Sequence, residues 1–390
     1  MKSIQTLDAV CTQIVDCEHK TAPKVANGQY FAVGTPAMAG NRIDFGKARR
    51  ISKETFASWT RRMAPRHGDL LLAREAPVGP VVQIPETENV APGQRTVLLR
   101  PDPAAVDSTF LYYFLSSPEQ QKLLQVNAAG STVPHLNVAD VRTFAVRLPD
   151  LTKQRATAET LSALDDKIAA NVKLADLSDQ LVRASYGEVA ATAIDTKPVG
   201  ALAWSPRQLI DPADVADDTP YIGLDHMRRR HMWLNEVSRS GTVSSAKTCF
   251  ECGDILFGRL RPYFHKVVAA PVSGLCSTDI LVCRPKSPEL AGFVLAAISS
   301  DHVVERCTSA SEGTRMPRSS WNDLQTVEVS WPGEPAASAL SARVITLQAA
   351  TEAALSECAT IAALRDTLLP QLISGKLRVR DAEKQVEEVT

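Results

Sequence analysis

The sequence lacks the features that mark membrane-spanning, disulfide-built and uniformly basic proteins. No run reaches the roughly 18 consecutive apolar residues of a transmembrane helix, and the first residues contain no apolar signal segment. The eight cysteines are few for 390 residues and irregularly spaced, which indicates reduced thiols. A net charge of −1 excludes a basic coat but not a locally basic face. We therefore expect a cytoplasmic protein.

Two nucleotide-binding signatures are also missing. The chain has no glycine-rich phosphate loop ending in Lys-Ser or Lys-Thr, and no convincing dinucleotide fingerprint. Nucleotide hydrolysis or methyl transfer by this chain is therefore not expected. The apolar share of 44% and the charged share of 22% are typical of a folded protein, and 390 residues exceed one ordinary core. We expect two domains.

A tandem duplication is visible when the chain is compared with itself at an offset of 183 to 185 residues. The matching segments occur in the same order in both halves: Gly68–Arg74 with Gly253–Arg259, Gly130–Pro134 with Gly313–Pro317, and Asp140–Val146 with Asp323–Val329. Pro149 and Pro332 close the two copies. Ordered matches at nearly one offset indicate that the same module occurs twice.

Each copy begins with a segment of mixed α/β character, rich in glycine, proline and β-branched residues. The pattern predicts strands at 79–84, 96–100, 266–270 and 279–283, and helices at 108–125 and 287–307. The predicted fold class is therefore mixed α/β (α+β), with two pseudo-symmetric globular domains.

Each copy ends in a long helical pattern. Apolar residues recur at three- and four-residue steps through 152–186, and again through the segment that begins at 334. Thirty-five residues at about 1.5 Å each would make a rod of roughly 50 Å. We expect the rods to pair as an antiparallel coiled-coil spacer. The predicted parts are domain 1 at 1–151, a spacer helix at 152–186, domain 2 at 187–333, a second spacer helix at 334–375 and a charged tail at 376–390.

Basic residues concentrate in repeat-equivalent windows. Residues 42–74 carry nine Lys and Arg against three acids, and residues 226–266 carry eight against three. Two such windows favour double-stranded DNA as the ligand, although solvated basic faces would explain either window alone. The candidate DNA-binding residues in them are Arg42, Lys47, Arg49, Arg50, Arg61, Arg62, Arg74, Arg228, Arg229, Arg230, Arg259, Arg261 and Lys266.

Further DNA contacts are expected from a pair of Gly-Pro loops. Their hydroxyls and backbone amides suit phosphate oxygens, although each loop could also be an ordinary turn. The candidates here are Ser131, Thr132 and His135 in the first loop, with Arg315 and Arg318 in the second. Arg74, Arg259 and Arg261 could instead form structural salt bridges, and consecutive Arg228–Arg230 cannot all face one groove.

Three stretches carry a family resemblance: the loop 130–136, the helix segment Leu164–Ile168 with Gln154 and Asn171, and the terminal segment Leu368–Val379. With them the chain resembles, over essentially its full length, the DNA-specificity subunit of Type I restriction-modification systems. The resemblance implies a non-catalytic subunit with two target-recognition domains. Each domain would read one half of a bipartite sequence.

The resemblance also implies partners. The long helices would dock two methyltransferase subunits and, through them, restriction/translocase subunits; S-adenosylmethionine, ATP and Mg²⁺ would be bound by those partners and not by this chain. The docking residues it suggests are Gln154, Leu164, Ile168, Asn171, Leu368 and Leu372. The second copy departs from the pattern, because Trp331–Glu334 leads into its helix without an equivalent of Gln154.

Three alternatives stay open. Cys249, Cys252, Cys276 and Cys283 could bind zinc, but the second pair has a six-residue gap. Asp150 with Asp165 and Lys167 imitates a Mg²⁺-dependent nuclease motif, yet its later part falls inside a helical pattern. A non-DNA structural adaptor is the third, and the duplicated basic windows argue against it.

Overall fold

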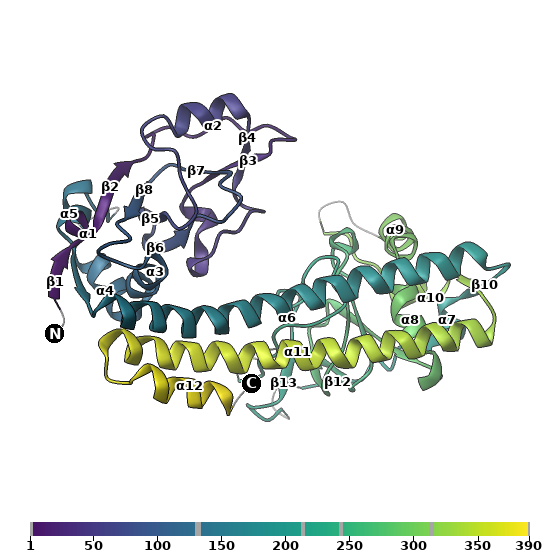
Figure 1. Cartoon of the computed structure of the whole chain (residues 1–390). Coiled ribbons are helices and arrows are strands. Elements are labelled where there is room, and N and C mark those ends of the chain that lie inside the picture. Colours follow the sequence, from purple (N-terminus) through teal and green to yellow (C-terminus); the bar gives the residue numbers. More distant parts are fainter. Residues whose placement is uncertain (1–2, 129–133, 212–214, 242–244, 312–315, 389–390) are drawn as a thin grey trace. The chain divides into compact units, whose positions relative to one another are not determined.

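The computed structural model describes residues 3–128, 134–211, 215–241, 245–311 and 316–388. Its contacts divide the chain into two compact units: unit 1 comprises 1–166 with 361–390, and unit 2 comprises 167–360. Both boundaries fall inside long helices, α6 (Leu151–Thr192) and α11 (Glu334–Ser374). Each unit therefore contains one globular part and a portion of both helices (Figure 1).

Unit 1 is built around a four-stranded antiparallel sheet in the order β2-β8-β5-β6. A second sheet, β4-β3-β7, contains one parallel pair, and β1 pairs with β9. The strands are β1 (Ser3–Thr6), β2 (Cys11–Asp16), β3 (Tyr30–Val33), β4 (Arg49–Ile51), β5 (Leu70–Arg74), β6 (Val78–Gln83), β7 (Val90–Pro92), β8 (Thr96–Pro101) and β9 (Ala145–Leu148). The helices are α1 (Leu7–Val10), α2 (Lys53–Trp59), α3 (Ser108–Ser116), α4 (Pro118–Val126), α5 (Val138–Thr143) and α12 (Val379–Glu387).

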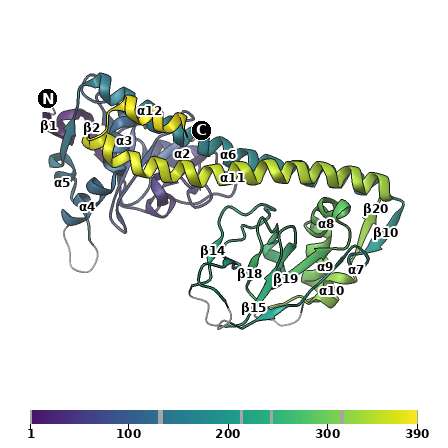
Figure 2. The same ribbon diagram turned by 90° about the horizontal axis from the view of Figure 1, so that it is seen from below.

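Unit 2 repeats this plan. Its four-stranded sheet has the order β11-β19-β16-β17, its second sheet has the order β12-β15-β18-β13-β14, and β10 pairs with β20 beside α11 (Figure 2). The strands are β10 (Asp195–Pro198), β11 (Ala203–Trp204), β12 (Leu209–Ile210), β13 (Pro220–Ile222), β14 (Ser238–Arg239), β15 (Lys247–Phe250), β16 (Ile255–Gly258), β17 (Val267–Ala269), β18 (Gly274–Cys276), β19 (Ile280–Pro285) and β20 (Glu328–Trp331). The helices are α7 (Val199–Leu202), α8 (Ala291–Ile298), α9 (Asp301–Ala310) and α10 (Trp321–Gln325).

The two globular parts share details that only a duplication explains. Each ends in a short strand that leads directly into a long helix, and each contains an isolated bridge, Glu75 with His135 and Leu260 with Arg318. In both, the strand after the Gly-Asp turn, β5 or β16, is buried along its length because it lies inside the sheet with both faces covered. The predicted duplication and mixed α/β class are confirmed.

The long helices are antiparallel where they meet inside each unit. In unit 1 Asp165 contacts Arg365. In unit 2 the side chain of Asn171 donates to the Ala354 carbonyl at 3.1 Å, and Arg343 donates to Ser185 at 3.4 Å. Residue numbers thus fall along α11 as they rise along α6. The predicted start of α6 is one residue from the observed start, and the helix extends six residues past the predicted end, through Gly187.

Three predicted elements differ from the structure. The helix predicted at 108–125 divides at Ser117, whose extended backbone (ψ 145°) precedes Pro118. The helix predicted at 287–307 likewise divides, because Ser300 is extended and caps α9 by accepting the Val303 amide. The segment predicted as a charged tail contains α12, which buries Ala382.

Candidate nucleic-acid interface

The exposed basic residues of unit 1 centre on β4, the edge strand of its smaller sheet. Arg49 and Arg50 are both exposed there, and the Arg50 guanidinium lies 5.4 Å from the centre of the Phe31 ring. Lys47, Arg49 and Arg95 line a depression of about 250 Å³ with backbone from Gly34. Lys47 pairs with Asp44 at 3.1 Å, so its positive charge is partly neutralised. The charge of Arg49 is less neutralised than that of Lys47.

The pair that follows α2 is partly neutralised. Arg61 lies 2.9 Å from the Glu18 carboxylate and Arg62 lies 3.8 Å from it, and Arg62 also donates to the Asp16 carbonyl. Both arginine side chains nevertheless remain about half exposed, at 57% and 46%. Exposed ion pairs of this kind are weak, so the guanidinium groups stay available to a stronger anion.

Arg74 and Arg259, which occupy equivalent positions, are structural in their contacts. Arg74 donates to the Leu136 carbonyl at 3.2 Å and lies 3.3 Å from Asp16, and its side chain is only 11% exposed. Arg259 donates to the Ser319 carbonyl at 2.9 Å. In both units this arginine joins the Gly-Asp strand to the segment after the Gly-Pro loop, so it has little capacity left for DNA.

Arg228–Arg230 lie against helix α6 and its neighbours in unit 2. Arg228 and His231 are 3.8 and 3.6 Å from Asp176 of α6, and Arg230 pairs with Asp301 at 2.7 Å. Arg229 stacks over the Phe264 ring at 3.8 Å. The three side chains thus have separate partners, and which of them would face a DNA groove stays a prediction.

The segment Arg259–Lys266 forms a tight loop next to that run. Arg261 and His265 both have positive φ (51° and 53°), an uncommon conformation for residues with a side chain. Tyr263 at the loop's tip is 51% exposed. Burial lowers the pKa of Lys266, whose amine donates to the Leu224 carbonyl. Tyr263 is therefore the member of this loop best placed to meet a ligand, whereas Arg261 is only partly exposed.

Only part of each Gly-Pro loop lies within the described residues. Ser131, Thr132 and Arg315 lie outside the described residues. His135 and Arg318 occupy the two equivalent bridges, and Arg318 donates to Asp279 at 2.9 Å. Arg42 does not point into the basic face of β4 but pairs with Asp165 of α6. Whether any of these residues binds DNA stays a prediction.

The six residues predicted to dock partners face inward instead. All are at most 8% exposed: Gln154, Leu164, Ile168, Asn171, Leu368 and Leu372. The Gln154 side chain accepts the Asp107 amide and donates to the Pro149 carbonyl, so it fastens the first turn of α6. These residues pack the helices and leave little surface for a partner.

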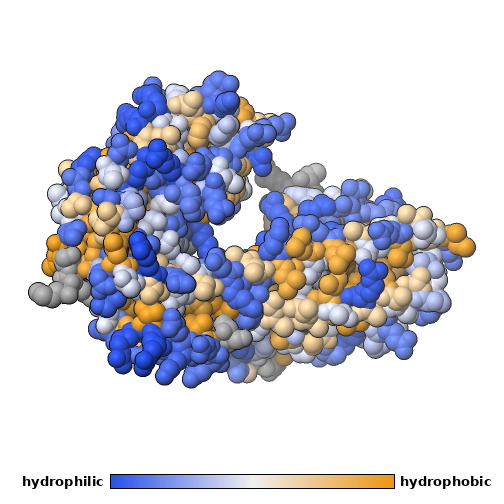
Figure 3. All heavy atoms as spheres, in the orientation of Figure 1, coloured by the Kyte–Doolittle hydropathy of each residue, from blue (hydrophilic) through white to orange (hydrophobic). Residues whose placement is uncertain are grey.

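The surface that α6 does present in unit 2 is an apolar stripe that the sequence analysis missed. Leu174, Leu177 and Leu181 are 42%, 48% and 46% exposed, and exposed Ala170 and Ala184 continue the same alternating four- and three-residue spacing. Apolar patches interrupt the hydrophilic surface along the helices (Figure 3). The signal was present as a second apolar face on the helix, beside the buried one.

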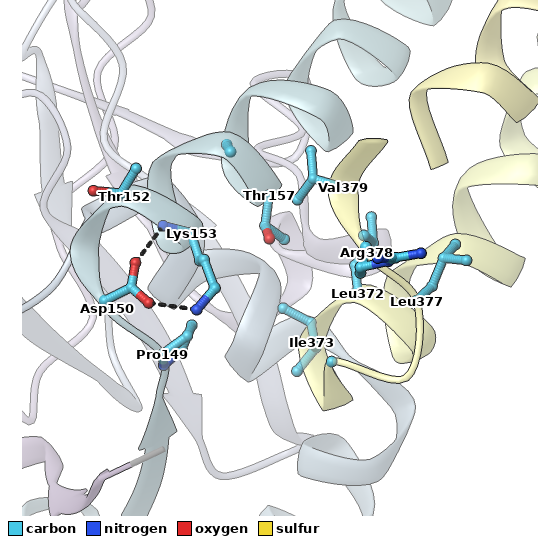
Figure 4. Close-up of a pocket in the computed structure, with 12 residues that line it drawn as sticks. Pro149, Asp150, Thr152, Lys153, Thr157, Leu372, Ile373, Leu377, Arg378 and Val379 are labelled. Atoms are coloured by element: carbon cyan, nitrogen blue, oxygen red, sulfur yellow. Dashed lines mark hydrogen bonds and ion pairs between the residues drawn. The ribbon is translucent and has the colours of Figure 1, made fainter. Parts of the chain in front are cut away.

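A cavity of about 510 Å³ lies in unit 1 where α6 begins and α11 ends (Figure 4). Leu372, Ile373, Leu377 and Val379 supply apolar walls, and Thr157 faces them from α6. Lys153 stands at the other side and is paired with Asp150 at 2.7 Å. The cavity can accept an apolar side chain and brings together residues of the terminal segment.

The structure does not favour the alternative sites. The four cysteines considered for zinc do not gather into one group of potential ligands in the described part of the chain. Asp16, Cys17 and His19 do lie together, but Arg74 already pairs with Asp16. The nuclease motif fails because Asp165 and Lys167 lie on α6, and Asp165 accepts hydrogen bonds from other side chains. The described residues contain no helix long and apolar enough to cross a bilayer.

Comparisons with known proteins agree with the duplicated fold. Residues 24–176 match the family described as Type I restriction modification DNA specificity domain. The chain is 23% identical over 283 residues to the Type I restriction enzyme EcoDI specificity subunit of Escherichia coli, a match that covers 62% of either chain and thus less than two thirds of that relative. It is similar in fold to the crystal structure of a Type-I restriction-modification system S subunit from M. genitalium (TM-score 0.60, 16% identity, 95% of this chain and 96% of that one). A further match is the HsdS subunit from Thermoanaerobacter tengcongensis (TM-score 0.36, 14% identity, 96% and 97%).

Proposed function

Since residues 24–176 match the family described as Type I restriction modification DNA specificity domain, we propose that the chain is a non-catalytic specificity subunit that reads a bipartite DNA target. The observation that carries this proposal is the duplication: the two globular parts have corresponding four-stranded sheets, and each part leads into a long helix. One module that occurs twice suits a ligand that is contacted twice. Each globular part would read one half-site.

Phosphate contacts would come from the exposed basic residues. In unit 1 these are Arg49 and Arg50 on β4, with Arg61 and Arg62 nearby. In unit 2, Arg228, Arg229 and Arg230 are exposed, and the exposed Tyr263 lies in the neighbouring loop of 259–266. Because the arginine fork can bind either phosphate or guanine, these arginines would position the duplex, and Tyr263 would meet it beside them.

Partner docking would use the exposed surface of the helices and not their buried residues. The stripe Leu174–Leu177–Leu181 on α6 suits an amphipathic helix of a methyltransferase subunit, and the cavity beside Leu372 and Ile373 suits a single apolar side chain. S-adenosylmethionine, ATP and Mg²⁺ would be bound by methyltransferase and restriction subunits. Since the ligand is DNA, we place the assembly in the cytoplasm.

The test is selection of DNA from a random duplex library by the full-length chain co-purified with its methyltransferase subunit. We expect two short conserved blocks separated by a gap of constant length and free sequence. Enrichment of one uninterrupted block, or no enrichment over a library incubated with the methyltransferase subunit alone, would refute the proposal.

A further inference from the structure

One carboxylate on α6 joins three elements of unit 1. Asp165 accepts hydrogen bonds from the Tyr113 hydroxyl of α3 at 2.7 Å, from Arg365 of α11 at 2.6 Å, and from Arg42 of the loop between β3 and β4. The Asp165 side chain is only 18% exposed. Burial raises the pKa of Tyr113, so its hydroxyl keeps the proton that it donates. The globular part and both long helices thus meet at a single residue.

Asp165 lies far enough along α6 for its contacts to restrict rotation of the globular part. α6 begins at Leu151, and the hydrogen bonds of Gln154 form the first attachment between this helix and the globular part. Asp165 lies fourteen residues beyond Leu151, which is about 21 Å at ~1.5 Å per residue. Over that distance, a 1 Å shift at Asp165 corresponds to a rotation of the globular part by only about 3°. Two fastenings so far apart prevent it from pivoting about the junction at Pro149.

The ion cluster around Asp165 borders a hollow. A depression of about 260 Å³ opens beside the ion cluster, lined by Arg42, Tyr112 and Arg365 as well as Asp165 itself. The charged hydrogen bonds of Asp165 add directional contacts here to the packing of buried apolar side chains on the same helices, such as Leu164 and Leu368. Removing the carboxylate would take away the anion that Arg42 and Arg365 share, leaving Arg365 with Asp366 alone.

We propose that Asp165 is a positioning residue that fixes the tilt of the first globular part on the helix pair and thereby sets the length of the gap accepted between the two half-sites. This inference rests on the proposed function. Asp165 itself touches no DNA in this account; it acts through the geometry that it imposes.

The test measures gap length and not only activity. The full chain, co-purified with its methyltransferase subunit, is offered a duplex library with both selected half-sites and every gap from four base pairs below to about four above the preferred one. The variants are Asp165→Asn and the milder Arg42→Gln and Tyr113→Phe, each of which removes one link. The exposed neighbour Asp166→Asn is the matched control.

We expect the wild type and Asp166→Asn to prefer one gap over its neighbours by at least about tenfold, a discrimination comparable to that against a wrong base pair. Asp165→Asn should reduce this preference to about twofold with unchanged half-sites, and Arg42→Gln and Tyr113→Phe should give intermediate values. Weaker binding at all gaps in equal proportion would show a merely structural role and overturn the inference. A wild-type chain that selects no bipartite target would instead refute the proposed function.

Discussion

At the residue scale, the basic side chains divide into those that face solvent and those that hold the fold. Arg74 and Arg259 follow the same turn in both copies, and sequence spacing alone made them candidates for DNA. Their partners, the Leu136 and Ser319 carbonyls, lie 60 or more residues away along the chain. No local pattern reports a contact of that range, which is why the sequence could identify basic windows but not sort their members.

This division predicts opposite outcomes for two substitutions. Arg74→Ala should lower the free energy of unfolding by about 1–3 kcal/mol, because it takes the Arg74 donor from the buried Leu136 carbonyl and removes the ion pair with Asp16. Arg50→Ala should leave stability within about 0.5 kcal/mol but weaken DNA binding and reduce the salt dependence by about one counterion. Urea unfolding and DNA titrations at several salt concentrations measure both. A stable Arg74→Ala chain that loses DNA affinity would reverse our assignment.

His265 predicts a pH dependence of stability. Burial lowers the pKa of His265, opposed by the hydrogen bond to Ser299 and aided by nearby Arg183. The unfolded chain therefore binds the proton more readily, so this residue removes stability as the pH falls below about 6.5 and towards the lower pKa of the folded state.

His265→Asn should reduce that loss, because asparagine tolerates the positive φ and does not titrate. Urea unfolding at about pH 7 and about pH 5 compares the two proteins, and the loss of unfolding free energy between these values should be smaller in the variant. An equal loss in both would show that His265 does not contribute to the acid sensitivity.

At the scale of elements, the spacing of apolar residues and the helix-terminating residues predicted the long helices. The predictions failed where a capping residue divides a shorter helical segment. The long helix predicted from 334 is observed at Glu334–Ser374. The shorter helices were over-extended because a single serine that caps the next helix, as Ser300 does, looks like an ordinary helical residue in sequence. The terminal segment was predicted as a tail because most of its residues are polar or charged, and Ala382 is the one residue of α12 that is buried.

The exposed stripe on α6 predicts how a partner attaches. Leu174→Asp with Leu181→Asp should lower the affinity for the methyltransferase subunit by at least about tenfold, because charges replace apolar side chains that the partner would bury. Gln180→Asp, exposed on the same helix, should have little effect. Co-purification and calorimetric titration measure the affinity. Unchanged binding by the double variant, with an intact fold, would place the docking surface elsewhere.

At the scale of the whole molecule, the duplication was the most informative feature of the sequence. It predicted two similar globular parts and two long helices, and the sheets of both units agree with it. The way each part is fastened to the helices could not be predicted. Unit 1 uses Asp165, whereas in unit 2 Asp179 accepts the Met232 amide and Arg183 donates to the Ser299 carbonyl. These fastenings depend on side-chain positions that only the fold creates.

The most direct test of the account is the target of a chain that carries the first globular part twice, with 7–148 in place of 199–331. The methylated sites of cells that express it with the methyltransferase subunit would be mapped and compared with those of the wild type. Because the helices are antiparallel, we predict an inverted repeat of one wild-type half-site with the other half-site lost. A folded chain that still directs methylation to the original asymmetric target would contradict the claim that each copy reads one half.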